Sequence, residues 1–235
     1  MSGKTLKQFL AEAFVKQPGT QLGSNPGGIH VDDDGSKHYI KKYHNAEQAK
    51  AEVLAGKIYD HMGIKTLTPE MHDTHHVKTK WNDNVSTKSP SFYNKPSAKH
   101  AEQLGKIYHA AILTKNWDIL GPHDLGNIVH NKKTDDLHSI DHGGAFHFRA
   151  QGGYKNYDSN ISEKETLLKD QGLSSRVFNN AFKHHPGVEN HALESIKNIN
   201  HRHIKKLFEE SGLSNWRGLH DTFNKRFDNL LSSYK

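Results

Sequence analysis

Cysteine is absent from this chain of 235 residues. Its absence excludes disulfide bonds, thiolate metal sites and a cysteine nucleophile. Long apolar runs are also absent, since no stretch approaches the roughly 20 residues that a membrane-spanning helix needs. The N-terminal residues lack the continuous apolar core of a secretory signal. We therefore expect a protein without a membrane span that works in the cytoplasm or is secreted by a dedicated system into a host cell.

Blocks of a single charge are missing as well. The 32 basic and 26 acidic residues are interspersed, so the formal net charge of +6 predicts no specific binding to nucleic acid. Twenty histidines make the true charge sensitive to pH below neutrality. The mean hydropathy of −0.85 is low, but the apolar residues fall in periodic clusters, which indicates a folded chain.

The first part of the chain has the pattern of a loop and hairpin followed by a long helix. Residues 6–15 predict a short helix, and a loop rich in Gly, Pro and Ser follows over residues 18–28. Two strand-like runs, 29–31 and 38–43, flank an Asp-Asp-Asp-Gly turn and predict a hairpin. Apolar residues at three-to-four-residue spacing predict a helix over residues 46–62 that ends at a glycine.

The rest of the chain predicts short strands, a linker and a helical C-terminal part. In order, these are strands at 68–72 and 75–81, a polar linker over 82–96, a helix over 98–117, strands at 128–130 and 137–140, and helices from 163 onward with breaks near Gly172, Pro186 and Gly212. This order predicts one α+β domain over residues 1–235. Its small β-rich N-lobe with one helix spans about 1–82, its linker about 83–97 and its mainly helical C-lobe about 98–235.

Polar side chains lie at the open end of the second expected hairpin. If its strands pair symmetrically about residue 134, Asn127 lies across from Asp141. Two oxygen-bearing side chains then meet, and oxygen ligands are what Mg²⁺ takes while it also holds substrate phosphates. The sequence therefore predicts a magnesium site at Asn127 and Asp141.

Five short motifs follow one another between about residue 22 and residue 150. They are Gly23-Ser24-Asn25-Pro26-Gly27-Gly28, Tyr39-Ile40-Lys41, Ala51-Glu52-Val53-Leu54-Ala55, Asn116-Trp117-Asp118 and Asp141-His142-Gly143. Together they resemble the protein-kinase superfamily, most closely its compact and divergent bacterial members, the HipA-like kinases and the small effector or toxin kinases. Each motif alone is weak, and the order and spacing of the set carry the resemblance.

The resemblance implies a minimal bilobal kinase-like fold that binds ATP and Mg²⁺. In kinases a Gly-rich loop covers the phosphates, and a strand lysine that is paired with a helix glutamate orients them. The nucleotide-binding residues that the resemblance implies are Gly23, Ser24, Gly27, Gly28, Lys41 and Glu52. We expect Lys41 rather than Lys42 in the cleft, because alternation along a strand sends only one of them inward.

Two aspartates are candidates for the catalytic base. In ordinary kinases the base precedes the metal-binding Asn by five positions, whereas Asp118 precedes Asn127 by nine and Asp124 precedes it by three. The Asn-x-Asp context favours Asp118 with a longer loop, and Asp124 is the alternative. Arg149 could steady a phosphate or the segment after Asp141, or it could be a solvated surface residue.

The histidine pairs suggest zinc only superficially. His75-His76, His184-His185 and the spaced pair His201 and His203 lack an evident shared acidic partner, and no His-Glu-x-x-His motif occurs. We therefore expect no zinc site from these pairs.

The resemblance implies an ATP- and magnesium-dependent phosphotransferase, and most closely a protein Ser/Thr kinase of bacterial effector or toxin type. Its partner would be a host or other cellular protein, and the chain would act as a monomer. Two alternatives remain: a pseudokinase that serves as a binding module, and a kinase-fold enzyme that transfers AMP.

Overall fold

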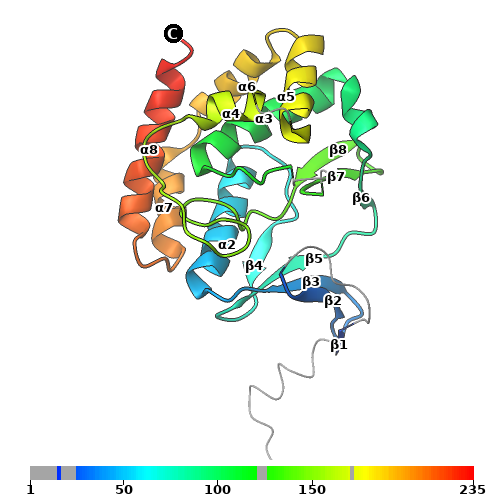
Figure 1. The fold of residues 1–235 in the computed structure, drawn as a ribbon. Coiled ribbons are helices and arrows are strands. Elements are labelled where there is room, and N and C mark those ends of the chain that lie inside the picture. The colour runs from blue at the N-terminus through cyan, green and yellow to red at the C-terminus, as the bar shows by residue number, and fades with distance from the viewer. Residues whose placement is uncertain (1–14, 17–24, 121–125, 170–171) are drawn as a thin grey trace, which may run out of the picture.

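The computed structural model describes residues 15–16, 25–120, 126–169 and 172–235 (Figure 1). Among these residues, none of the helices combines the length and the apolar character that crossing a membrane requires. The helix expected over residues 6–15 lies outside the described residues except for Val15. That residue belongs to the short strand β1 (Val15–Lys16), which corrects the C-terminal end of the prediction.

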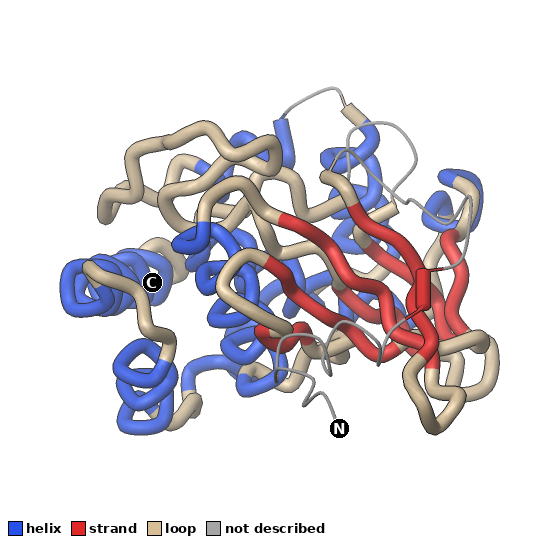
Figure 2. The backbone as a smooth tube through the Cα atoms, turned by 90° about the horizontal axis from the view of Figure 1, so that it is seen from below, coloured by secondary structure: helices blue, strands red, loops and turns tan. Residues whose placement is uncertain are grey.

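Five antiparallel strands form one sheet in the order β1-β2-β3-β5-β4. The strands other than β1 are β2 (Gly27–Val31), β3 (Lys37–Lys42), β4 (Pro69–Met71) and β5 (His76–Lys80). Figure 2 shows this sheet as a layer beside the helices. The expected hairpin is confirmed: the Asp32 carboxylate accepts the backbone N–H of Ser36 at 2.7 Å, and Gly35 takes the positive φ of 78° that the turn requires.

The helix α2 (Ala46–His61) joins the sheet to the rest of the molecule. The Asn45 side chain caps its start by accepting the backbone N–H of Glu47 at 2.8 Å, and Gly63 follows its end with a φ of 75°. One part of α2, including Val53, packs on the sheet with Val77 and Tyr43. Most of its buried face belongs instead to the large core that the C-terminal helices also form.

Residues 82–96 are more ordered than the expected polar linker. They contain strand β6 (Val85–Thr87) and the 3-10 helix η1 (Pro90–Asn94). Strand β6 pairs with β7 (Ile128–Asn131), which pairs with β8 (Asp136–Ser139) in a second, three-stranded sheet. A strand of three residues is too short to show a periodic pattern, and its pairing with a distant strand explains why the sequence did not reveal it.

The helices that follow bury the main core. They are α3 (Ala98–Thr114), α4 (Glu163–Lys169), α5 (Leu173–His184), α6 (Val188–Lys197), α7 (His201–Glu210) and α8 (Trp216–Ser232). The expected breaks near Gly172, Pro186 and Gly212 are confirmed. Helix α3 ends at Thr114 because the next residue, Lys115, takes a left-handed φ of 54°, so the helix stops before the expected residue 117. Helices α3 and α6 approach closely at Gly105, where a Cβ would lie 2.9 Å from the Cβ of Ala192.

Candidate active site

Lys41 bridges two carboxylates from distant parts of the chain. Its Nζ lies 3.0 Å from Oε1 of Glu52 on α2 and 2.6 Å from Oδ1 of Asp141, which follows β8. The Lys41 and Glu52 side chains are 8% and 5% exposed, whereas Asp141 keeps 39% of its side-chain surface. Of the two carboxylates, Asp141 is therefore the one that a cation from solvent could reach.

The charges of these three residues depend on one another. Burial acts to lower the pKa of Lys41, but the Asp141 and Glu52 carboxylates outweigh it and hold that pKa well above its ordinary value. Burial acts to raise the pKa of Asp141, and the Lys41 ammonium more than offsets it, so that pKa lies below its usual value. Burial raises the pKa of Glu52 despite Lys41. A protonated Lys41 beside an ionised Asp141 is thus the stable arrangement.

The strand β3 determines which of the two adjacent lysines enters the site. Lys41 is buried and Lys42 is exposed, as strand alternation predicted. The Lys41 ammonium also lies 4.9 Å from the centre of the Tyr43 ring. That ring lies close to the backbone after Asp141, because a Cβ on Gly143 would collide with the Tyr43 hydroxyl. Gly143 is therefore required by this close approach.

The register of the second hairpin differs from the prediction by one residue. Ile128 pairs with Ser139, and the N–H of Ile140 donates to the carbonyl of Asn127 at 2.9 Å, so Asn127 lies across from Ile140 and not from Asp141. Four residues separate β7 from β8. Because the number of turn residues is even, the hairpin is symmetric about a point between residues 133 and 134, and not about residue 134. Asp141 itself takes a left-handed φ of 54°, which ends the strand direction at that residue.

The segment before β7 links Asn116, Asp118 and Asn127. The Asn116 side chain accepts the backbone N–H of Asp118 at 3.2 Å, and the Asn127 side-chain amide donates to the Asp118 carbonyl at 2.6 Å. Burial raises the pKa of the half-buried Asp118 carboxyl, the negative charge of Asp141 adds to the increase, and Lys155 and Lys41 oppose it. A raised pKa improves a carboxylate as a proton acceptor. The alternative base, Asp124, lies outside the described residues.

The Gly-rich motif is only partly within the described residues, and part of it is corrected. Gly23 and Ser24 lie outside them. Gly27 and Gly28 belong to strand β2, where they pair with Lys41 and Ile40, rather than to a loop. A Cβ on Gly27 would lie 2.9 Å from the Ile40 carbonyl oxygen, so close packing on β3 explains this glycine without a phosphate.

Two residues that the sequence did not indicate hold the segment after Asp141 in place. The Gln48 side chain on α2 donates to the carbonyls of Gly143 and Arg149, both at 2.9 Å. The buried Lys155 ammonium donates to the carbonyls of Lys115 and Gly144 and so ties this segment to the end of α3. Gln48 lies one helical turn before Glu52, which is the one signal that could have identified it. Lys155 belongs to no motif.

Two cationic side chains flank the Trp117 ring, which directly precedes Asp118 in the chain. Trp117 is 44% exposed, and its indole N–H donates to Glu163 at 3.0 Å. The Arg149 guanidinium and the Lys155 ammonium lie 5.7 and 5.1 Å from the centre of the Trp117 ring. Arg149 is itself exposed. Its position near the site is consistent with both of its predicted roles and does not decide between them.

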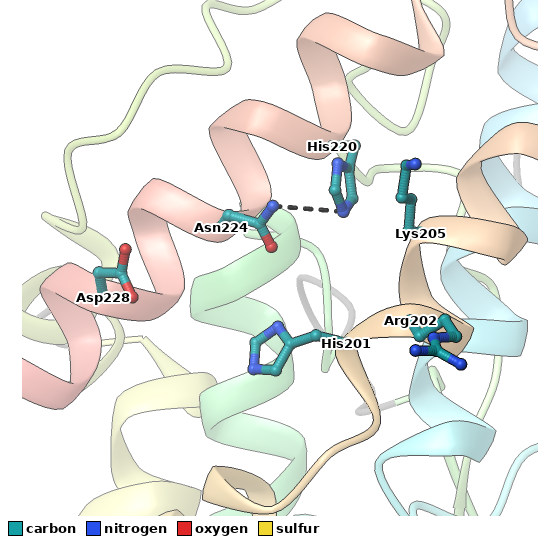
Figure 3. Close-up of a pocket in the computed structure, with 6 residues that line it drawn as sticks. All are labelled: His201, Arg202, Lys205, His220, Asn224 and Asp228. Carbon is teal, nitrogen blue, oxygen red and sulfur yellow. Dashed lines mark hydrogen bonds between the residues drawn. The ribbon is translucent and has the colours of Figure 1, made fainter.

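A hollow elsewhere on the molecule lies between α7 and α8 (Figure 3). Its lining includes His201, Arg202 and Lys205 from α7, with His220, Asn224 and Asp228 from α8. The side chains of Asn224 and His220 share a hydrogen bond of 3.2 Å. None of the three residues Lys41, Glu52 and Asp141 lines this hollow.

Comparison with known proteins supports the kinase-like architecture. The crystal structure of the proinflammatory kinase CtkA from Helicobacter pylori matches 91% of this chain and 91% of its own, with a TM-score of 0.57 and 13% sequence identity. The crystal structure of the choline kinase LicA from Streptococcus pneumoniae matches 97% of this chain and 96% of its own, with a TM-score of 0.36 and 8% sequence identity. No protein-family model matches the chain, and no curated protein matches it in sequence. The likeness to CtkA confirms the expected α+β, compact bilobal kinase-like fold.

Proposed function

We propose that this chain is an ATP- and magnesium-dependent phosphotransferase with its active site at Lys41, Glu52 and Asp141. The observation that carries the proposal is the buried lysine held between a buried glutamate and a partly exposed aspartate, within a kinase-like fold. Protein kinases use a strand lysine, a helix glutamate and a metal-binding aspartate in this combination.

The donor atoms fit an ATP–magnesium complex. Asp141 offers a partly exposed carboxylate. The Asn127 amide nitrogen donates to the Asp118 carbonyl, and the amide oxygen is the atom of this side chain that could bind a cation. We propose these two residues as the magnesium ligands, because carboxylate and amide oxygens suit this hard cation. When bound, the metal neutralises charge that develops on the transferred phosphoryl group.

The residues of the chain then have distinct roles. The Lys41 ammonium, oriented by Glu52, binds and positions the nucleotide phosphates. The Asp118 carboxylate accepts the proton of the acceptor hydroxyl. At the same time the hydroxyl oxygen forms a bond to the γ-phosphorus, the bond from that phosphorus to the β,γ-bridging oxygen breaks, and ADP leaves. Asp124 remains the alternative base. Gly23, Ser24 and Gly28 remain predicted phosphate contacts, whereas the close approach of Gly27 to β3 favours a packing role for that residue.

The acceptor in this proposal is a Ser or Thr hydroxyl of a protein. CtkA is a proinflammatory kinase, and its likeness to this chain is one of fold. We propose the effector role on host proteins from the sequence resemblance. The closer relation to HipA-like kinases, the monomeric state, the lobe boundaries and the compartment stay predictions.

The experiment that tests the proposal uses γ-labelled and α-labelled ATP in parallel. The purified chain with Mg²⁺ and a set of candidate proteins should transfer label from γ-labelled ATP only, and the Asp141→Asn variant, which removes charge without volume, should transfer none. Transfer from α-labelled ATP would establish AMP transfer instead. Nucleotide binding without any transfer would support a pseudokinase, and unchanged activity in Asp141→Asn would refute the role of Asp141.

A further inference from the structure

Two histidines and an aspartate from three elements converge at the tip of the β7–β8 hairpin. His100 lies in the first turn of α3, His130 in β7, and Asp135 in the turn before β8. The Nε2 atoms of His130 and His100 lie 2.7 and 3.3 Å from the same carboxylate oxygen, Oδ1 of Asp135. All three ligand atoms lie within 4.8 Å of one another.

The two imidazoles are held in place before any ligand binds. His100 and His130 are 5% and 7% exposed, and the Phe92 ring lies 5.3 and 5.5 Å from theirs. His130 sits in the central strand of its sheet, opposite Ser86 and Leu137. Rigid, buried ligands on defined elements are what a specific metal site requires.

The hairpin tip is also fastened to α3 around this cluster. The Lys99 ammonium donates to the carbonyl of Thr134 at 2.8 Å, and the Gln103 side chain accepts the N–H of Leu137 at 3.0 Å. Asp135 takes a left-handed φ of 55°, and its N–H donates to the carbonyl of Asn131 at 2.8 Å. The backbone therefore directs the Asp135 carboxylate toward both histidines.

We propose that His100, His130 and Asp135 form a zinc site that fastens the β7–β8 hairpin to α3. Two imidazole nitrogens and one carboxylate oxygen are a ligand set that zinc binds at about 2.0–2.2 Å, which puts tetrahedral ligands about 3.3 Å apart. The His100–Asp135 distance of 3.3 Å already has this value, and the His130–Asp135 distance must open from 2.7 Å to about the same value. The Asp135 side chain is 64% exposed, so it can make that adjustment. The Nε2 atom of His100 also lies 3.1 Å from the backbone carbonyl oxygen of Asp135, and zinc bound at this nitrogen would replace that hydrogen bond.

The proposal is independent of the phosphotransferase activity, although the two sites share a hairpin. Strand β7 follows Asn127, and β8 leads to Asp141, so zinc at the tip would stabilise the element that presents both predicted magnesium ligands. The oxygen-only pair at the open end suits Mg²⁺, and the nitrogen-rich set at the tip suits zinc. Among the described residues, the Nδ1 atom of His130 has no hydrogen-bond partner, and a missing outer partner of this kind weakens metal affinity by about 10–100-fold. We therefore expect zinc to bind about 10–100-fold more weakly than at a site whose histidines have such partners.

The test titrates zinc into the 235-residue chain without a histidine tag, after chelation and dialysis, by isothermal calorimetry. Wild type should bind one equivalent more than the Asp135→Asn variant, and Co²⁺ should give the visible absorption of a tetrahedral site in wild type alone. Asn tolerates the left-handed conformation of residue 135, so this variant should fold normally. Because the chain has 20 histidines, His184→Asn, at an exposed histidine on α5, is the matched control and should bind as wild type does.

Thermal unfolding with added zinc gives a second measurement. Zinc should raise the unfolding temperature of wild type and His184→Asn, since a ligand that binds the folded state stabilises it. Asp135→Asn and His130→Asn should need at least a tenfold higher zinc concentration for the same increase in unfolding temperature. Equal zinc binding by wild type and Asp135→Asn would overturn the proposal. The proposal would also be overturned if wild type, His184→Asn, Asp135→Asn and His130→Asn all bound the same amount of zinc. The cluster would then be a set of hydrogen bonds that holds the hairpin to α3 without a metal.

Discussion

Lys41 and Lys42 are neighbours on β3, but they have opposite surroundings. The Lys41 ammonium contacts two carboxylates in the interior, whereas the Lys42 side chain is exposed. A lysine held by carboxylates at fixed distances can bind phosphates without first being ordered, and a solvated lysine cannot.

The pair provides a matched test at two adjacent positions of one strand. Lys41→Ala should lower kcat/KM by about 10²-fold or more, the loss typical when one preorganised donor is removed. Lys42→Ala should change it by less than about threefold, since exposed charges contribute little. Steady-state kinetics and nucleotide binding on both variants provide the measurement. A larger loss in Lys42→Ala would show that β3 presents the other face to the nucleotide.

The catalytic base is a second question at the scale of single residues. Asp118→Asn should lower kcat by about 10²–10⁴-fold, the usual contribution of a general base, with little change in nucleotide affinity. Asp124→Asn should have the milder effect. Measuring kcat and nucleotide Kd for both variants tests this, because the reverse ranking would identify Asp124 as the base, and loss of ATP binding in Asp124→Asn would indicate a metal or loop role. Small, equal effects would argue against this chemistry at the loop.

Helix α3 carries a buried histidine where it meets the C-terminal end of the chain. His109 is fully buried, and its Nε2 lies 3.2 Å from the hydroxyl of Tyr234. Burial, and next the nearby positive charge of Lys164, lower the pKa of His109 to about 3. The folded protein therefore keeps this imidazole neutral at pH values where the unfolded chain would protonate it.

This histidine should make the contact between α3 and the C-terminus sensitive to acid. Since the folded pKa lies below the unfolded value of about 6.5, the full contribution to stability is present above that value and is lost as pH falls toward 3. Between pH 7.5 and pH 5, wild type should lose about 2 kcal/mol more unfolding free energy than His109→Gln. Urea denaturation at the two pH values measures the difference. Parallel losses in the two proteins would contradict the burial of a neutral His109.

Arg226 connects the C-terminal helix to the rest of the molecule. Its guanidinium is fully buried on α8, pairs with the buried Glu163, and donates to the carbonyls of Ile112 on α3 and Asp158. Figure 1 shows the long segment between β8 and α4 passing in front of α2 and reaching α8. Arg226 therefore ties together the end of that segment, α3 and α8, and Lys155 and Gln48 hold its beginning.

Removal of Arg226 should destabilise the whole fold. Arg226→Met should lower the unfolding free energy by about 3–5 kcal/mol, because it removes the cation that is hydrogen-bonded to the buried Glu163 carboxylate and leaves that carboxylate with the more distant Lys115 ammonium at 3.7 Å. Arg226→Met combined with Glu163→Gln should be less destabilised than Arg226→Met alone, since no buried charge then lacks a partner. Urea denaturation of the single and double variants measures the coupling. Additive losses would show that Arg226 acts through packing rather than through the ion pair.

Local patterns in the sequence predicted most elements and the inward direction of Lys41. The helix expected over residues 46–62 is α2 (Ala46–His61), and the first hairpin has its expected turn. These predictions succeed because side-chain periods of 3.6 and 2.0 residues follow from the geometry of a single element, whatever it packs against.

The relations between elements required the three-dimensional structure. Asn127 lies across from Ile140 because four residues, not an odd number, form the β7–β8 turn. Lys155 reaches the carbonyl of Lys115, and His100 meets His130, although no motif joins either pair. Such contacts depend on how elements far apart in sequence pack together, and the spacing of residues within one element contains no information about that packing.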